Sequence, residues 1–137
     1  MGHASVKKTL DVSADALWKV VQDFGNTSWM PAGTPAEIVG EGPGMARLIG
    51  APGQQIREQL ESVDEASRTL VYSIPENVPF PVTNYRATMQ VRQEGEGSEL
   101  TWSCEFEPND GAEEKARTAI EGMYAVMIGW IGEKAAG

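Results

Sequence analysis

The 137-residue chain is long enough for one globular domain with its own hydrophobic core and too short for two of ordinary size, so we expect residues 1–137 to form a single domain. Its hydrophobic content of 41% and charged content of 23% are typical of globular proteins. The formal net charge of −9, from 20 acidic and 11 basic residues, argues against nucleic acid and anionic membrane surfaces as partners.

The cysteine and histidine content limits the chemistry that the chain can carry. The single cysteine, Cys104, excludes an internal disulfide and suits a reducing compartment, so we expect a cytoplasmic protein. The single histidine, His3, argues against Cys/His catalytic pairs and histidine-rich metal sites, and we expect no metal and no other cofactor. The longest nearly apolar segment, residues 123–132, is too short to span a membrane, and no signal peptide is visible.

The first third of the chain predicts a strand, a helix and an irregular segment. Residues 6–12 alternate weakly in polarity and predict a strand. Ser13 can cap a helix over residues 14–24, because its hydroxyl can accept a hydrogen bond from the first turn. An irregular segment, 26–35, and a short strand, 37–40, follow.

Five strands joined by hairpin signals are predicted next, and a long helix ends the chain. The strands are expected at residues 45–49, 54–61, 69–74, 82–92 and 99–107. The helix is expected from about Ala112 to Lys134, with Asn109 or Asp110 as its cap. Its apolar stripe, at spacings of three and four, comprises Ala116, Ile120, Met123, Met127 and Trp130 or Ile131. The pattern predicts an α+β domain in which the helix covers the apolar face of an antiparallel sheet.

Glu58 is the most informative residue, because it is a carboxylate on an otherwise apolar strand face. Period-two alternation places it on the same face as Ile56 and Leu60. Burying an unpaired carboxylate is costly, so this one must be paired, protonated or take part in chemistry. Arg47 lies on the apolar face of the preceding strand and offers an opposite charge. We favour a functional site, although buried ion pairs can also be purely structural.

Hairpin register predicts the neighbours of Glu58. If the Gly-Ala-Pro-Gly segment forms the turn after Arg47, Met45 lies opposite Glu58 and Arg47 lies diagonal to it. Continuing across the sheet places Tyr72 beside Glu58, and a bulge near Ser62 would shift part of this register.

The inward-facing residues describe an apolar surface with few polar groups, which is typical of small-molecule sites. The expected ligand-binding residues on the strands and the final helix are Met45, Ile56, Tyr72, Tyr85, Met89, Trp102, Phe106, Met123 and Met127. For any one of these residues, a place in a dry core is the commoner role. Glu58 and Arg47 are the candidate catalytic residues, because charges are rarely buried without a function or a good partner.

Short segments along nearly the whole chain also match a known superfamily in order. They are Ala16-Leu17-Trp18, Asp23-Phe24-Gly25 with Trp29, Gly42 to Arg47, Arg57 to Leu60 with Asp64, Tyr72-Ser73-Ile74, Thr83-Asn84-Tyr85, and Trp102 with Phe106-Glu107-Pro108. In these the chain resembles the helix-grip (START-like, Bet v 1-like or SRPBCC) superfamily. The resemblance is to its bacterial polyketide cyclase/dehydrase-like members and to the branch of abscisic acid receptors and lachrymatory factor synthase.

The resemblance implies a seven-stranded antiparallel sheet curled around a long C-terminal helix, short helices between the first and second strands, and an internal apolar cavity. It places Glu58, Arg47 and Tyr85 in that cavity, with loops at residues 50–53 and 78–82 closing over it. In synthase-like members, the equivalents of Glu58 and Arg47 are taken to move a proton on a small substrate.

Two departures from the receptor pattern argue against a hormone-receptor role. Residues 37–40 contain no lysine to hold a hormone carboxylate. The latch loop carries Phe80 and Pro81 where receptors carry histidine and arginine. Phe80 is also among the residues expected to bind the ligand.

The favoured prediction is that the chain binds a small apolar ligand in an internal cavity, where Glu58 and Arg47 orient its polar end. The alternative is a cofactor-independent cyclase, dehydratase or isomerase of a small carbonyl or polyketide-like compound. In that case Glu58 would be the general acid or base, Arg47 would hold a substrate oxygen, and Tyr72 and Tyr85 would donate hydrogen bonds. A structural role with a collapsed cavity is a third possibility. The expected partner is a small hydrophobic molecule, bound by a monomer or homodimer.

Overall fold

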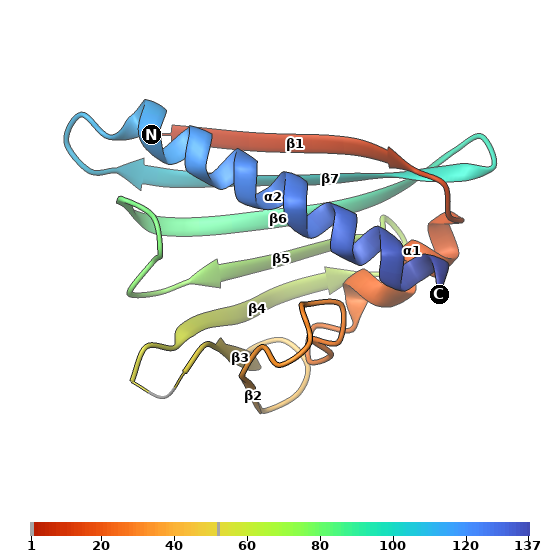
Figure 1. Cartoon of the computed structure of the whole chain (residues 1–137), viewed down its shortest axis with the longest axis horizontal. Helices are drawn as coiled ribbons and strands as arrows, with labels where there is room; N and C mark the ends of the chain where they lie inside the picture. The colour runs from red at the N-terminus through yellow and green to blue at the C-terminus, as the bar shows by residue number, and fades with distance from the viewer. Residues whose placement is uncertain (1, 52) are drawn as a thin grey trace.

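A seven-stranded antiparallel sheet with the order β1-β7-β6-β5-β4-β3-β2 frames the computed structural model, which describes residues 2–51 and 53–137 (Figure 1). The strands are β1 (Gly2–Leu10), β2 (Ala36–Val39), β3 (Ala46–Ile49), β4 (Ile56–Asp64), β5 (Thr69–Ile74), β6 (Val82–Glu94) and β7 (Gly97–Pro108). Helix α1 (Ala14–Gln22) follows β1, and helix α2 (Glu113–Ala136) ends the chain. The predicted α+β helix-grip fold is confirmed. Pro52, in the predicted turn and cavity loop, lies outside the described residues.

The two helices begin in different ways. The hydroxyl of Ser13 accepts a hydrogen bond from the backbone N–H of Ala16 at 3.1 Å, so the predicted cap of α1 is confirmed. The predicted cap of α2 at Asn109 or Asp110 is wrong. Ala112 occupies that position without a side-chain hydrogen bond, and its N–H donates instead to the Asn109 carbonyl at 2.9 Å, which closes a turn before the helix.

The hairpin of β3 and β4 is wider than its turn signal predicts. Ile49 pairs with Ile56, and Arg47 lies directly opposite Glu58 rather than diagonal to it, because β3 ends at Ile49 and β4 begins only at Ile56. The shift is two residues, so every inward-facing side chain still faces inward. The bulge expected near Ser62 is present between β4 and β5.

Across the rest of the sheet, part of the predicted register holds. Leu60 pairs with Tyr72, so the prediction that Tyr72 lies opposite Glu58 is wrong. On the neighbouring strands, the inward-facing residues Met89 and Trp102 lie opposite each other.

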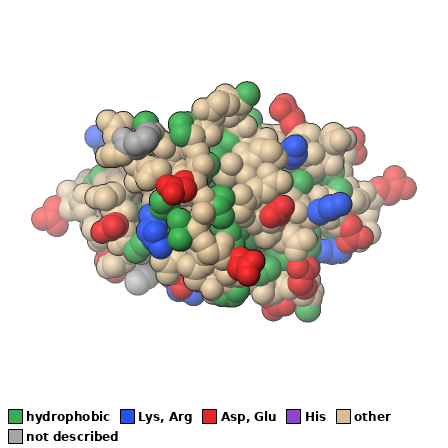
Figure 2. Space-filling view, turned by 90° about the horizontal axis from the view of Figure 1, so that it is seen from below, with side chains coloured by type: hydrophobic (Ala, Val, Ile, Leu, Met, Phe, Trp, Pro, Cys, Tyr) green, Lys and Arg blue, Asp and Glu red, His purple; other side chains and the backbone are tan. Residues whose placement is uncertain are grey.

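Helix α2 lies obliquely over the sheet and contacts β1 and β7, while α1 packs against α2, β6 and β7 (Figure 1). The buried side chains of α2 include Ala116, Ile120, Tyr124, Ile128 and Ile131. Met123 is therefore a wrong prediction for the core-facing stripe, since spacings of four select Tyr124 and leave Met123 45% exposed. The face of the molecule that points downward in Figure 1 carries acidic and basic side chains scattered among apolar ones (Figure 2).

Candidate functional site

A pocket of about 380 Å³ lies between α2, the strands β3 to β6 and two loops. Its walls comprise Met30, Pro31, Thr34, Ile49, Ile56, Glu58, Tyr72, Ile74, Pro79, Phe80, Tyr85, Met123, Tyr124, Met127 and Trp130. Small-molecule sites are typically about 300–1,000 Å³ in volume and mainly apolar, with a few polar groups. This pocket is at the small end of that range and fits the description, because its polar groups are one carboxylate, four hydroxyls and the indole N–H of Trp130.

The structure brings together some of the residues predicted for the site and leaves others apart. Glu58, Ile56, Tyr72, Phe80, Tyr85, Met123 and Met127 line the pocket. Arg47, Met45, Met89, Trp102 and Phe106 do not line it. Met89, Trp102 and Phe106 are buried on β6 and β7, the side of the sheet where α2 packs, so they belong to the dry core. Met45 lies just before β3, beside Gly25.

Several pocket residues were missed by the sequence reasoning. Ile49 and Ile74 carried a usable signal, since they share strand faces with Arg47 and Tyr72. Tyr124 was missed because the helical stripe was assigned to Met123. Met30, Pro31, Thr34 and Pro79 lie in segments without regular periodicity, so no pattern indicates which way their side chains point.

An ion pair lies at one wall of the pocket. Arg47 Nε donates to Glu58 Oε1 at 2.6 Å, and one Arg47 Nη donates to the Phe24 carbonyl at 3.2 Å. The guanidinium stacks on the Phe24 ring at 4.0 Å from its centroid, with the rings of Trp29 and Tyr72 at 5.8 Å. Arg47 is 4% exposed and Glu58 is 17% exposed. Arg47 is therefore fixed behind the wall, and only the carboxylate of the pair lines the pocket.

Three tyrosine hydroxyls meet where β5, β6 and α2 converge. Tyr85 and Tyr124 are hydrogen-bonded to each other, and the Tyr72 hydroxyl lies 3.5 Å from that of Tyr85. Trp102 Nε1 donates to the Tyr72 hydroxyl at 3.2 Å, and its ring stacks on Tyr124 with centroids 4.7 Å apart.

Burial raises the pKa of each of these three phenols above its ordinary value. The negative charge of Glu58 raises the pKa of Tyr72 further. All three hydroxyls therefore stay protonated at neutral pH. The pocket combines a carboxylate acceptor with neutral hydroxyl groups.

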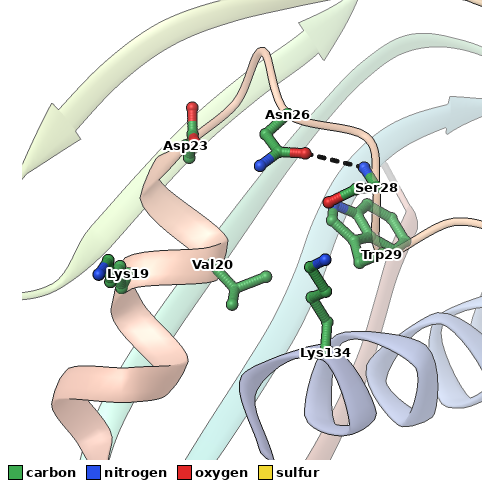
Figure 3. Close-up of a pocket in the computed structure, with 7 residues that line it drawn as sticks. All are labelled: Lys19, Val20, Asp23, Asn26, Ser28, Trp29 and Lys134. Atoms are coloured by element: carbon green, nitrogen blue, oxygen red, sulfur yellow. Dashed lines mark hydrogen bonds between the residues drawn. The ribbon is translucent and has the colours of Figure 1, made fainter. Parts of the chain in front are cut away.

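A second, smaller hollow of about 190 Å³ lies beside α1 and the end of α2 (Figure 3). Its walls are Lys19, Val20, Asp23, Asn26, Ser28, Trp29 and Lys134. The Asn26 side-chain oxygen accepts from the Ser28 N–H at 2.9 Å, and Lys134 extends toward Trp29 (Figure 3). The side chains of Lys19 and Lys134 are exposed, so water solvates their charges. We therefore take the larger, apolar pocket as the candidate functional site.

Among residues 2–51 and 53–137, no three His, Cys, Asp or Glu side chains are grouped so that they could hold a metal ion. Neither helix in the described part of the chain is both long enough and apolar enough to pass through a membrane.

Comparisons with known proteins agree on the fold. The family model described as "Polyketide cyclase / dehydrase and lipid transport" matches residues 1–129. The structure of XoxI from Bacillus cereus is similar with 30% identity and a TM-score of 0.82, covering 97% of this chain and 94% of that one. An uncharacterized protein from Bacillus thuringiensis is similar with 28% identity and a TM-score of 0.83, covering 99% and 100%.

A plant enzyme shares the fold at lower identity. Truncated norcoclaurine synthase from Thalictrum flavum is 23% identical, with a TM-score of 0.79 and coverage of 96% of this chain and 91% of that one. The search of curated proteins found no match.

Proposed function

Because the chain belongs to the polyketide cyclase / dehydrase and lipid transport family, within the predicted Bet v 1-like (SRPBCC) superfamily, we propose that it binds a small, largely apolar molecule in the pocket between α2 and the sheet. The observation that carries this proposal is the pocket itself. It has a volume of about 380 Å³ and mainly apolar walls, and Glu58 is held at one wall by a buried arginine.

Two physical arguments favour binding over a collapsed structural core. An open apolar pocket leaves hydrocarbon surface in contact with water, at a cost of roughly 25 cal/mol for each Å² that a ligand would bury. A buried ion pair is also poor at stabilising a fold, since apolar side chains of similar volume are often equally good. The open pocket and the pair of Arg47 and Glu58 are thus better explained by a ligand than by packing.

Adjacent residues of α2 provide a matched test. Met127 lines the pocket, whereas Val126 is 50% exposed and does not line it. We expect Nile red, a neutral apolar dye, to bind the wild type and the Val126→Trp variant alike. Met127→Trp should weaken binding at least tenfold by filling the pocket, as measured by dye emission. Equal binding by all three proteins would exclude this pocket as the binding site.

Catalysis is the second candidate function, favoured by the presence of Glu58 and the tyrosine hydroxyls in one pocket. Glu58 would take or give the proton, and the hydroxyls would stabilise charge that develops on a substrate oxygen. Arg47 does not line the pocket, so it would not contact a substrate oxygen in the way that the sequence predicts. It would instead be a positioning residue that holds Glu58.

The Glu58→Gln variant separates the two functions. Wild type and variant would each be incubated with a small-molecule extract of the host, and bound and altered compounds would be identified by mass spectrometry. A compound that both proteins bind and only the wild type converts would support catalysis. Conversion by the variant at the wild-type rate would exclude Glu58 as the acid or base, and binding without conversion by either protein would leave binding as the function.

A further inference from the structure

We propose that the pocket selects a compact ligand whose buried end carries a hydroxyl group, and that it rejects carboxylates and phosphates, including fatty acids and phospholipids. This proposal rests on the ligand-binding function proposed above and narrows its chemistry. It follows from the charges and the hydrogen-bonding capacity of the side chains that line the pocket.

The charge of the pocket wall has one sign. Glu58 is the only charged residue among those lining the pocket in the described part of the chain, and no lysine, arginine or histidine accompanies it there. The nearby cation, Arg47, is 4% exposed and already engaged by Glu58 and by the ring and carbonyl of Phe24. A ligand carboxylate would therefore meet a like charge in apolar surroundings, with no cation within reach.

The exposed part of the lining is also uncharged. Pro31, Pro79 and Met123 are the exposed residues among those lining the pocket. None of them offers a charge or a hydrogen-bond donor to a phosphate. The partly exposed lining adds only neutral donors, the hydroxyl of Thr34 and the indole N–H of Trp130, so an acidic head group would gain no cation there, and a phospholipid or a phosphorylated carrier is disfavoured as well.

Glu58 retains unused capacity to accept hydrogen bonds. An ionised carboxylate can accept about four hydrogen bonds. Among the hydrogen bonds of the described residues, Arg47 Nε is the one donor to Glu58, and it bonds to Oε1. A ligand donor at Oε2 would form a charge-assisted bond, which is roughly twice as strong as a bond between neutral groups.

The tyrosine cluster favours a ligand hydroxyl over a ligand group that can only donate hydrogen bonds. Tyr72, Tyr85 and Tyr124 hold three hydroxyl protons, and the two contacts between their oxygens require two of these protons. One proton is therefore left to donate elsewhere. A ligand hydroxyl can donate to Glu58 and accept from this cluster at the same time, whereas an ammonium group can only donate. Tyr72 and Glu58 line the same pocket, and the guanidinium that bonds to Glu58 lies 5.8 Å from the centre of the Tyr72 ring.

Three probes with one aromatic body test the proposal on the wild type. Naphthylmethanol, methylnaphthalene and naphthoate, substituted at the same ring position, differ only in the hydroxymethyl, methyl or carboxylate group. Titration calorimetry should give naphthylmethanol a Kd at least tenfold lower than that of naphthoate and several-fold lower than that of methylnaphthalene. Binding of naphthoate as tightly as naphthylmethanol, or of methylnaphthalene as tightly as naphthylmethanol, would overturn the proposal.

Two variants in which a carboxamide replaces a carboxylate test whether Glu58 causes the selectivity. Glu58→Gln removes the charge of the pocket, so naphthoate should gain affinity, naphthylmethanol should lose it, and the ratio of their Kd values should approach one. Glu61→Gln is the matched control on the same strand, since Glu61 does not line the pocket and accepts a hydrogen bond from Ser73. An unchanged ratio in Glu58→Gln would overturn the proposal. If that variant does not fold, the order of the three Kd values for the wild type still supports or overturns the proposal.

The outcomes also distinguish this proposal from the proposed function. Suppose naphthoate binds most tightly, and Met127→Trp weakens all three probes. Ligand binding in the pocket then stands, and the proposed selectivity is wrong. If neither Nile red nor any of the three probes binds the wild type, the ligand-binding function fails, and the selectivity fails with it.

Discussion

The guanidinium of Arg47 is held by groups of different chemistry: the carboxylate of Glu58, the carbonyl of Phe24 and the aromatic ring of Phe24. A planar guanidinium can donate in its plane and stack on a ring face at once, whereas a lysine ammonium cannot. The residue therefore fixes the orientation of the Glu58 carboxylate and joins β3 to the segment that follows α1.

Removing one partner of this ion pair should destabilise the fold more than removing both. Arg47→Met leaves the Glu58 carboxylate without its counter-charge, and we expect a loss of about 3 kcal/mol in the free energy of unfolding. The double variant Arg47→Met with Glu58→Met should recover most of that loss, because two apolar side chains replace the pair. Urea denaturation measures both changes. A double variant as unstable as the single one would contradict this account.

The three buried tyrosines predict a loss of stability at alkaline pH. Their folded-state pKa values are raised by burial, so the unfolded chain releases these protons first as the pH rises. Their contribution is complete below the unfolded pKa of about 10 and declines as the pH rises above it, at up to about 1.4 kcal/mol per pH unit for each tyrosine.

Urea denaturation between about pH 8 and about pH 11 would test this dependence. The Tyr124→Phe variant should show a shallower decline than the wild type, because it has one fewer phenol to ionise in the unfolded state. Identical slopes in the two proteins would show that Tyr124 ionises equally in the folded and unfolded states.

At the residue scale, the sequence predicts that Arg47 and Glu58 form a charged pair, but it does not predict how deeply Arg47 is buried. Glu58 and Arg47 stand out because each interrupts an apolar period-two pattern, and such a pattern is local. The depth of Arg47 depends on Phe24 and Trp29, which both follow α1 in the sequence and reach β3 only in the folded chain. No pattern within one strand contains that information.

At the scale of elements, strand faces were predictable and loop lengths were not. The hairpin of β3 and β4 differs from its prediction by two residues, and Arg47 and Glu58 remain on the inner face because the period of a strand is also two. The phase of α2 was less predictable, since spacings of three and four fit both Met123 and Tyr124. The contact of Tyr124 with Trp102 on β7 fixes that phase in the folded protein.

Two glycines of α2 should respond differently to alanine. Gly129 has open space where a Cβ would lie, so Gly129→Ala should stabilise the protein by roughly 0.5–1 kcal/mol through helix propensity. At Gly132 a Cβ would lie 3.2 Å from a methyl carbon of Leu10, which must move to accommodate it. Gly132→Ala should therefore gain less or lose stability. Equal stabilisation in thermal unfolding would show that Leu10 yields without cost.

At the scale of the molecule, the position of α2 decides where the pocket lies. The helix packs on β1 and β7, whereas Ile56 and Glu58 of β4 and Ile74 of β5 line the pocket. The ordered segments of the sequence predicted this architecture, but they do not name a ligand. A plant enzyme and bacterial proteins share the fold, and one fold supports many chemistries according to its side chains.

A ligand that binds only the folded state should stabilise the whole molecule. At a ligand concentration about 100 times the Kd, the expected gain is about 2.7 kcal/mol. Naphthylmethanol should therefore raise the midpoint of thermal unfolding of the wild type and of Val126→Trp, but not of Met127→Trp. A rise of equal size in Met127→Trp would place binding elsewhere on the protein.

The distribution of tryptophans has a spectroscopic consequence. Trp18, Trp29 and Trp102 are each at most 7% exposed, whereas Trp130 is only partly buried and lines the pocket. The fluorescence of the three buried indoles should lie at short wavelength. The indole of Trp130 contacts both solvent and any molecule bound in the pocket, so its fluorescence should lie at longer wavelength and respond to binding. The unlabelled protein should thus carry its own optical reporter of occupancy, in which the long-wavelength edge of the emission moves when the pocket fills.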